Sequence, residues 1–248
     1  MDLELGTAVR RRKREKHIRI FIPVKDFQEK LEVTKLTLRW AISEFERVAL
    51  ACSFGKDSVT VLSLAREIDP QIKVFMIRTG YGFEETEKFK NRLKEEWDLN
   101  LEEISPSVSK DELEAEHGED LYSRDPKLCC EVLKVEPTIR YLNNLDAWIT
   151  GLRSDETEFR TNLRRVEEYE GMPTKVNPIV DWTNDEVWRF IKDNGIPYNP
   201  LYDEGYASLG CKPCTLAGTW GRYERAGRWH GKEKKECGMH LMDSSDSE

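Results

Sequence analysis

One segment in the first third of the chain restricts the possible fold more than any other. Residues 47–68 read RVALACSFGKDSVTVLSLAREI. The apolar run at 48–52 is typical of a buried strand, the polar stretch SFGKDS of a turn, and residues 59–68 of a helix. A strand that leads through a short loop into a helix is the repeating unit of α/β proteins with a parallel sheet.

Alternating strands and helices continue along the chain and define its fold class. The alternation predicts an α/β fold with an open, mostly parallel, twisted sheet and helices on both of its faces. Further strands are expected at 72–78, 99–104 and 147–150, and helices at 26–46, 85–97 and about 128–145.

The two ends of the chain differ from this regular middle part. From about Asn199 the pattern gives way to Gly, Pro and Cys, which predicts an irregular Cys-rich C-terminal section and a mobile tail. We therefore divide the chain into a basic N-terminal arm at 1–25, an α/β domain at 26–215 and a C-terminal tail at 216–248. The basic run at 10–19 fits either a solvated arm or a phosphate-binding arm.

Composition limits the class of protein. The 248 residues carry 39 basic and 47 acidic side chains, a net charge of −8, which argues against a chain wholly devoted to nucleic acid. No apolar run approaches the roughly 18 residues of a membrane span. The N-terminus lacks the apolar core of a secretory signal, so we expect a cytoplasmic protein without a membrane partner.

The loop after the first strand predicts an anion site. Glycine permits a tight turn and close backbone approach, and the N–H groups that open the next helix attract negative charge. The sequence matches neither the P-loop pattern nor the dinucleotide fingerprint, and an ordinary strand–helix turn is the alternative. The candidate binding residues are Ser53, Gly55, Lys56, Asp57 and Ser58.

Four of the six cysteines predict a metal centre. Cys211 and Cys214 have C-x-x-C spacing, which alone fits zinc, iron–sulfur or redox use. Cys129 and Cys130 are adjacent, and neighbouring helical side chains diverge by about 100°. Divergent thiolates suit the separate irons of a [4Fe–4S] cube better than a single ion. Structural zinc and buried or disulfide-linked cysteines are the alternatives.

Several stretches together carry a family resemblance that covers roughly residues 45–240. The chain resembles the assimilatory sulfonucleotide reductases, the APS/PAPS reductase family of the PP-loop superfamily, in its Cys-Cys pair, its later C-x-x-C and its terminal E-C-G-x-H. The stretches that carry this resemblance are SFGKDS, CCEVLKVEP, ITGLRSDET, NPIVDWTNDEVW, YNPLYDEGYASLGCKPCT, RAGRW and ECGMH. In SFGKDS, Phe54 stands where the family pattern has glycine.

The resemblance implies reduction of adenylyl sulfate (APS), or its 3′-phosphorylated form (PAPS), to sulfite. Cys237 matches the nucleophile that takes the sulfonate group, and thioredoxin or glutaredoxin then releases sulfite. Lys234 and Lys235 would favour its thiolate form, and Gly238 would free the backbone. His240 is expected to orient the sulfate or to lie in solvent.

The resemblance also implies a set of cationic binding residues, for which an ordinary surface charge is the alternative. Lys134 follows Cys130 by four residues and is expected to bridge the cluster and the substrate. A homo-oligomer is expected as well. The family's binding positions match Lys134, Gly151, Arg153, Arg160, Arg225 and Arg228.

Three departures from the family pattern keep a second function open. Lys56–Asp57 is intact, as in PP-loop enzymes that cleave ATP, Arg78 stands where the family has Asp, and Leu216 where an arginine is frequent. The alternative is an ATP pyrophosphatase or sulfurtransferase acting on DNA or tRNA, the one case that implies a nucleic-acid partner. A non-catalytic module is disfavoured because it leaves Cys237 without a role.

Overall fold

The computed structural model describes residues 26–218, 223–234, 236 and 238, and its centre is a six-stranded sheet. The strands are β1 Val48–Ala51, β2 Val74–Ile77, β3 Leu101–Ile104, β4 Ala147–Ile149, β5 Val166–Glu167 and β6 Thr174–Val176. Their order is β3-β2-β1-β4-β6-β5, and all neighbours pair in parallel except β5 and β6. The predicted open, mostly parallel sheet is confirmed.

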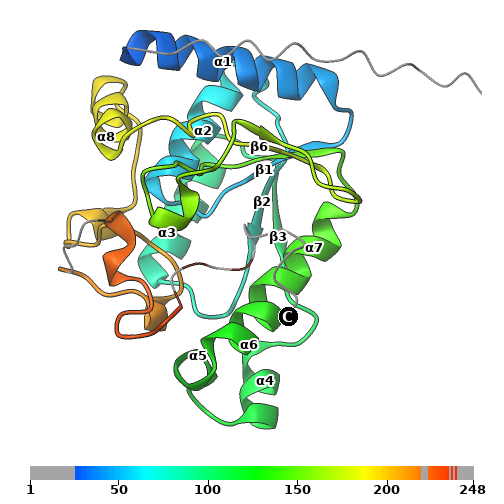
Figure 1. Cartoon of the computed structure of the whole chain (residues 1–248), viewed down its shortest axis with the longest axis vertical. Coiled ribbons are helices and arrows are strands. Elements are labelled where there is room, and N and C mark those ends of the chain that lie inside the picture. Colours follow the sequence, from blue (N-terminus) through cyan, green and yellow to red (C-terminus); the bar gives the residue numbers. More distant parts are fainter. Residues whose placement is uncertain (1–25, 219–222, 235, 237, 239–248) are drawn as a thin grey trace, which may run out of the picture.

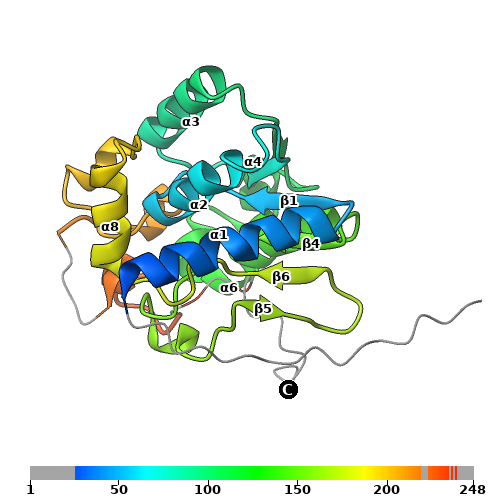
Figure 2. The ribbon, with the colours of Figure 1, turned by 90° about the horizontal axis from the view of Figure 1, so that it is seen from above.

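Helices cover both faces of the sheet because successive strand residues point to opposite sides. Leu50 packs in one core with side chains of α1 (Phe27–Glu44), α2 (Lys56–Arg66), α3 (Glu84–Glu96) and α8 (Asn184–Asp193). Figures 1 and 2 show the arrangement of these helices around the sheet. Its neighbour Ala49 packs in the opposite core, with Phe75 and the side chains of α7 (Glu136–Leu142). The short helices α4 (Lys110–His117), α5 (Leu121–Arg124) and α6 (Pro126–Cys130) extend beyond the sheet.

The prediction of a single helix at 128–145 is wrong in detail. The chain instead forms α6, a π-helical turn at Glu131–Val135 and then α7. Pro137 lies in the first turn of α7 and has no N–H to donate to the preceding turn, which breaks the regular α-helical pattern there. Lys134 therefore lies in a wide turn, a feature frequent at functional sites.

The loop between β1 and α2 also differs from the expected turn. Helix α2 begins at Lys56, three residues earlier than the apolar pattern indicates, so Lys-Asp-Ser forms its first turn. Phe54 has φ 57°, a left-handed conformation in which glycine is favoured, and its side chain is fully buried. Burial of the phenyl ring offsets the strain, which explains how phenylalanine stands where the family pattern has glycine.

The C-terminal section lies against α3 and near α5 (orange to red in Figure 1). Thr215 and Arg228 form a β-bridge, and the N–H of Trp229 donates to the carbonyl of Cys214 at 3.0 Å. These bonds join residues 225–229 to the C-x-x-C segment, across the predicted boundary at 215. The N-terminal arm, Cys237, His240 and the end of the tail lie outside the described residues. Within the described part of the chain, no helix is both long and apolar enough to cross a membrane.

Candidate active site

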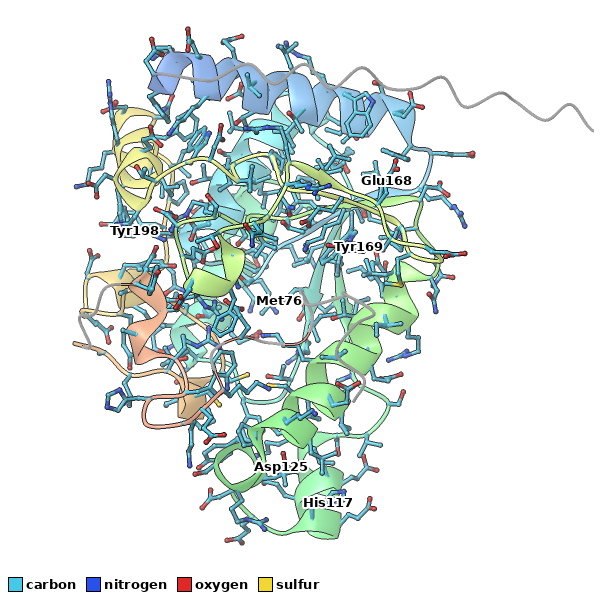
Figure 3. The ribbon with its side chains drawn as sticks, viewed as in Figure 1. Met76, His117, Asp125, Glu168, Tyr169 and Tyr198 are labelled. Atoms are coloured by element: carbon cyan, nitrogen blue, oxygen red, sulfur yellow. The ribbon has the colours of Figure 1, made fainter. Side chains whose placement is uncertain are left out.

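A cavity of about 350 Å³ opens at the carboxyl ends of the central strands. It lies where the strand order reverses between β1 and β4, which is the usual ligand position in open α/β sheets. Figure 3 shows Met76, at the end of β2, near the middle of the molecule beside this cavity. Of the predicted binding residues, the lining includes Ser53, Gly55, Asp57, Ser58, Lys134, Gly151, Arg160, Arg225 and Arg228.

Gly151 lies at the end of β4 against the start of α2. A Cβ atom at this position would lie 2.8 Å from the Cα of Ser58 and 2.9 Å from the carbonyl carbon of Asp57. Both neighbours are backbone atoms and have little freedom to move, so only glycine permits this close approach. Gly151 therefore holds the loop at the floor of the cavity.

Lys56 and Arg153 do not line the cavity, although both were predicted to bind substrate. They form a buried ion-pair network with Asp57 and Glu224, which we call the loop network. Lys56 Nζ lies 2.8 Å from Asp57 Oδ2, and Arg153 Nε lies 2.6 Å from Asp57 Oδ1. Both cations also bind Glu224, and Arg153 binds the more exposed Asp155. The side chains of Lys56 and Arg153 are 1% and 0% exposed, respectively.

The charges of the loop network are matched. Burial alone would lower the pKa of Lys56, but Asp57 and Glu224 raise it above its usual value. Burial would likewise raise the pKa of Asp57, but Lys56 and Arg153 hold it below its usual value. Each of the four groups has an opposite charge within hydrogen-bond distance. Burial still raises the pKa of Glu224 above its usual value, against the attraction of Lys56 and Arg153.

The backbone N–H of Lys56, at the start of α2, is also engaged. It donates to the hydroxyl of Tyr202 at 3.0 Å, and a Cβ at Gly55 would lie 3.2 Å from the same hydroxyl. The Ser58 hydroxyl donates to the carbonyl of Gly55 at 3.0 Å. One donor of the predicted anion site is thus used by Tyr202, which sequence reasoning did not identify.

A second group of buried cations lines the cavity itself and consists of Arg160, Arg225 and Arg228, which we call the arginine cluster. Within the described residues, the Nε atoms of Arg225 and Arg228 are buried without a hydrogen-bond partner. Burial lowers the pKa of Arg225 to about 10, and the like charges of Arg160 and Arg228 add to this fall. This arrangement is short of negative charge, which suits an anionic ligand.

Glu236, which directly precedes Cys237, is bound by the arginine cluster. Its carboxylate accepts hydrogen bonds from Arg160 Nε at 3.0 Å, from Arg160 Nη2 at 2.9 Å and from the Thr157 hydroxyl at 2.9 Å, and lies 3.4 Å from Arg225 Nη2. The glutamate of the E-C-G-x-H motif was the available signal for this contact, but its role follows only from the packing.

The four predicted metal-binding cysteines line one small cavity together with Tyr81, Tyr122 and Lys134. Burial raises the pKa of Cys129 to about 12, and the neighbouring thiols of Cys211 and Cys214 raise it further. A cationic partner would stabilise the Cys129 thiolate against burial and these neighbours, so the donor set fits a metal cofactor. In the described part of the chain, no group of three or more such side chains is arranged to hold a metal ion.

Lys134, from the π-helical turn, lines both the cysteine cavity and the main cavity. Burial and the neighbouring Cys211 raise the pKa of Cys214, and the positive charges of Arg228, Lys134 and Lys234 partly offset this rise. Cys211 and Thr79 also border both cavities, and the Thr79 hydroxyl lies 3.4 Å from Cys211 Sγ. Lys134 thus lies between the four cysteines and the main cavity, and its role toward a substrate stays a prediction.

Comparison with known proteins identifies the family of this chain. The family model for the phosphoadenosine phosphosulfate reductase domain matches residues 47–217. The chain belongs to this reductase family. Adenosine 5′-phosphosulfate reductases of Bacillus thuringiensis (strain Al Hakam) and Bacillus cereus (strain AH187) are 38% and 39% identical over 208 residues, which are 83% of this chain and 89% of each relative.

Solved structures place the reductase fold in a wider group. Phosphoadenylyl-sulfate reductase from Candida auris, in a phosphate complex, matches with a TM-score of 0.66 and 26% identity over 74% of this chain and 90% of its own. FMN adenylyltransferase from Candida glabrata matches with a TM-score of 0.60 and 18% identity over 77% and 65%, a likeness of fold alone. The predicted family and fold are confirmed, and with the family the predicted class, an oxidoreductase acting on a sulfur group.

Proposed function

We propose that the protein reduces adenylyl sulfate to sulfite and AMP in sulfate assimilation, with Cys237 as the nucleophile. The Bacillus relatives are adenosine 5′-phosphosulfate reductases, which favours APS over PAPS. The observation that carries the proposal is the binding of Glu236 by the arginine cluster. This contact places the residue next to Cys237 beside the arginines that line the cavity, and the Nε–H groups of two of them, Arg225 and Arg228, have no partner among the described residues.

Residues on both sides of Cys237 support its assignment as the nucleophile. Glu236 is held at the cavity wall, and Gly238 lies against Val135, because a Cβ there would be 3.4 Å from Val135 Cγ2. Val135 directly follows Lys134 in the π-helical turn. The two neighbours of Cys237 in the chain thus meet the arginine cluster and the turn that carries Lys134, both of which supply positive charge for a thiolate.

In the first step, the Cys237 thiolate attacks the sulfur of APS. A sulfur–sulfur bond forms while the bond between that sulfur and the bridging oxygen breaks, and AMP leaves with the electron pair. Negative charge grows on the bridging and phosphate oxygens during this step. Arg225, Arg228 and Lys134 line the cavity and are the cations available to stabilise that charge.

In the second step, a dithiol of the thioredoxin or glutaredoxin class regenerates the enzyme. Its thiolate attacks the Cys237 sulfur, sulfite leaves and a mixed disulfide forms. The second thiol then closes the partner's disulfide and releases Cys237 as a thiol. The two electrons gained by the sulfonate come from the partner, which balances the reaction.

Cys129, Cys130, Cys211 and Cys214 are the residues that would hold a [4Fe–4S] cluster. The four thiols line one cavity, and the diverging side chains of the adjacent Cys129 and Cys130 suit separate irons better than one zinc. Such a cluster would supply a fixed charge beside Lys134, and electron transfer through it is not required. The protein's own contribution is to hold Lys134 between the two cavities.

Anaerobic incubation with APS, PAPS or ATP, with and without a reducing dithiol, tests this function. Sulfite should form from APS only when the dithiol is present, and Cys237→Ser should abolish it without loss of iron. Cys130→Ser is the matched control and should lose iron. Iron loss in Cys237→Ser would show that Cys237 is a ligand, and AMP release from ATP without sulfite from APS would favour the sulfurtransferase alternative.

A further inference from the structure

Glu224 was not singled out in the sequence, yet it joins two parts of the site. It accepts hydrogen bonds from Lys56 Nζ of the loop and from Arg153 Nη2 after β4. It also opens the 3-10 turn Glu224–Gly227, whose next residue is Arg225. The loop network and the arginine cluster therefore share one short segment of backbone.

The contacts of Glu224 with Lys56 and Arg153 are strongly favoured, because these buried cations have few other carboxylates to pair with. Lys56 and Arg153 are almost fully buried, and among the described residues their partners are Asp57, Asp155 and Glu224. Glu224 is the one of these carboxylates that comes from the C-terminal section. Releasing it would leave two buried cations facing Asp57 and the more exposed Asp155, which is a costly arrangement.

The end of the segment that carries Arg225 and Arg228 is fixed as well. The N–H of Trp229 donates to the carbonyl of Cys214, and Arg228 Nη1 donates to the carbonyl of Leu209 at 2.9 Å. A Cβ at Gly210 would lie 2.0 Å from an Arg228 nitrogen, so glycine leaves the room that this guanidinium uses. Glu224 at one end and Trp229 at the other therefore define where Arg225 and Arg228 present their unpaired N–H groups.

We infer that Glu224 is a positioning residue, and that the intact Lys56–Asp57 pair serves to hold it rather than to bind the phosphates of a nucleotide. The inference rests on the proposed function, because it assigns the arginine segment to the sulfonucleotide. Lys56 acts through Glu224 on Arg225 and Arg228, because its side chain is 1% exposed and does not line the cavity. The Nζ is bound by Asp57 and Glu224, and the N–H by Tyr202.

A charge-balance cycle on the anaerobically purified enzyme tests this role. Lys56→Met leaves Glu224 with Arg153 as its one partner in the loop network, and Glu224→Gln leaves Lys56 with Asp57 alone, so each should displace the segment. The double variant removes one charge of each sign and keeps the Asp57–Arg153 pair. Each single variant should raise the KM for APS about tenfold with a smaller change in kcat, and the double variant should recover most of that loss.

The same cycle separates positioning from direct contact and from simple loss of fold. If Lys56 touches the substrate, Lys56→Met and the double variant will be equally impaired, and the inference is overturned. It is also overturned if both single variants keep the wild-type KM. Glu224→Asp, which retains the charge, should behave closer to wild type than Glu224→Gln, and an equal loss in both would point to packing alone.

AMP affinity, measured by calorimetry on the same four proteins, gives a readout that needs no turnover. Recovery of AMP binding in the double variant should follow recovery of the KM. If the wild type fails to reduce APS, the proposed function fails, and the AMP cycle still decides whether Glu224 positions the arginine segment. If the wild type reduces APS but AMP binding shows no recovery, the function stands and the positioning role fails.

Discussion

The loop network and the arginine cluster are both groups of buried cations around one cavity, but their charge balance differs. In the loop network, Lys56 and Arg153 face Asp57 and Glu224, and each charge is hydrogen-bonded to an opposite one. In the arginine cluster, Arg160 binds Glu156 and Glu236, and Arg225 lies 3.4 Å from Glu236. The Nε atoms of Arg225 and Arg228 have no partner among the described residues. Burial alone therefore does not distinguish a structural cation from a binding one, whereas unmatched charge does.

Replacing an arginine of the loop network should give the largest effect on stability. Arg153→Met leaves Asp57 and Glu224 with Lys56 alone, an uncompensated buried charge that typically costs about 3–5 kcal/mol. At about 2–4 °C per kcal/mol for a chain of this size, the Tm should fall by roughly 6–20 °C. Thermal unfolding followed by circular dichroism measures this, and an unchanged Tm would show that the loop network is not structural.

The same substitution in the arginine cluster should have the opposite profile. Arg225→Met removes a cation whose pKa is lowered to about 10 by burial and by its like-charged neighbours, so the Tm should stay the same or rise. The rate of sulfite formation from APS should fall by about 100-fold, the typical effect of losing one donor to a developing anion. A Tm that falls as far as that of Arg153→Met would remove the distinction between the two regions.

These two arginines also show what the sequence could and could not predict. The motifs correctly identified the family and the sheet, because strand–loop–helix patterns and cysteine spacing are local features. Both Arg153 and Arg225 matched binding positions, yet only Arg225 lines the cavity. The difference depends on Glu224, which is 71 residues from Arg153 in the chain, a pairing that no local pattern reveals.

Other misses have equally physical causes. The apolar periodicity predicts one continuous helix and does not show that Pro137 interrupts it and leaves a π-helical turn around Lys134. The hydrogen bond between Tyr202 and Lys56 joins residues 146 positions apart, which no local pattern reveals. Phe54 has a left-handed backbone at a position where the family pattern has glycine. The domain boundaries, the tail's mobility and the assignments of Cys237 and His240 stay predictions.

Glu236 links the arginine cluster to the segment that contains Cys237. Replacing Glu236 should cost less free energy than replacing Arg153. Burial would raise its pKa, but Arg225 and Arg160 hold it below the usual value of about 4.3. Its ion pairs therefore contribute fully at neutral pH and are lost only as the pH falls through that lowered pKa. At neutral pH, Glu236→Gln should weaken this docking by about 1.5–3 kcal/mol.

Alkylation of Cys237 by iodoacetamide, followed by peptide mass spectrometry, measures that docking. The rate in Glu236→Gln should rise by about tenfold or more, because every 1.4 kcal/mol is a factor of ten. The wild type should show no such rise between pH 8 and about pH 5, once the thiolate fraction is accounted for. An equal rate in both proteins at neutral pH would mean that Glu236 does not hold the segment that contains Cys237.

The smallest effect is expected away from both regions. Leu36 lies on α1 and is 60% exposed, far from the cavity lining. Leu36→Ser should change the free energy of unfolding by less than about 0.5 kcal/mol and leave the KM for APS unchanged. A larger change would show that surface substitutions perturb this fold generally, and the contrast between the two arginine variants would then lose its meaning.

The intact mass of the enzyme after reaction with APS tests the central claim most directly. Without a dithiol, the anaerobically purified protein should gain one sulfonate group on Cys237 and release one equivalent of AMP, and a dithiol should then release sulfite and restore the original mass. Turnover of APS with Cys237 unmodified would contradict the account, as would a sulfonate found on any other residue.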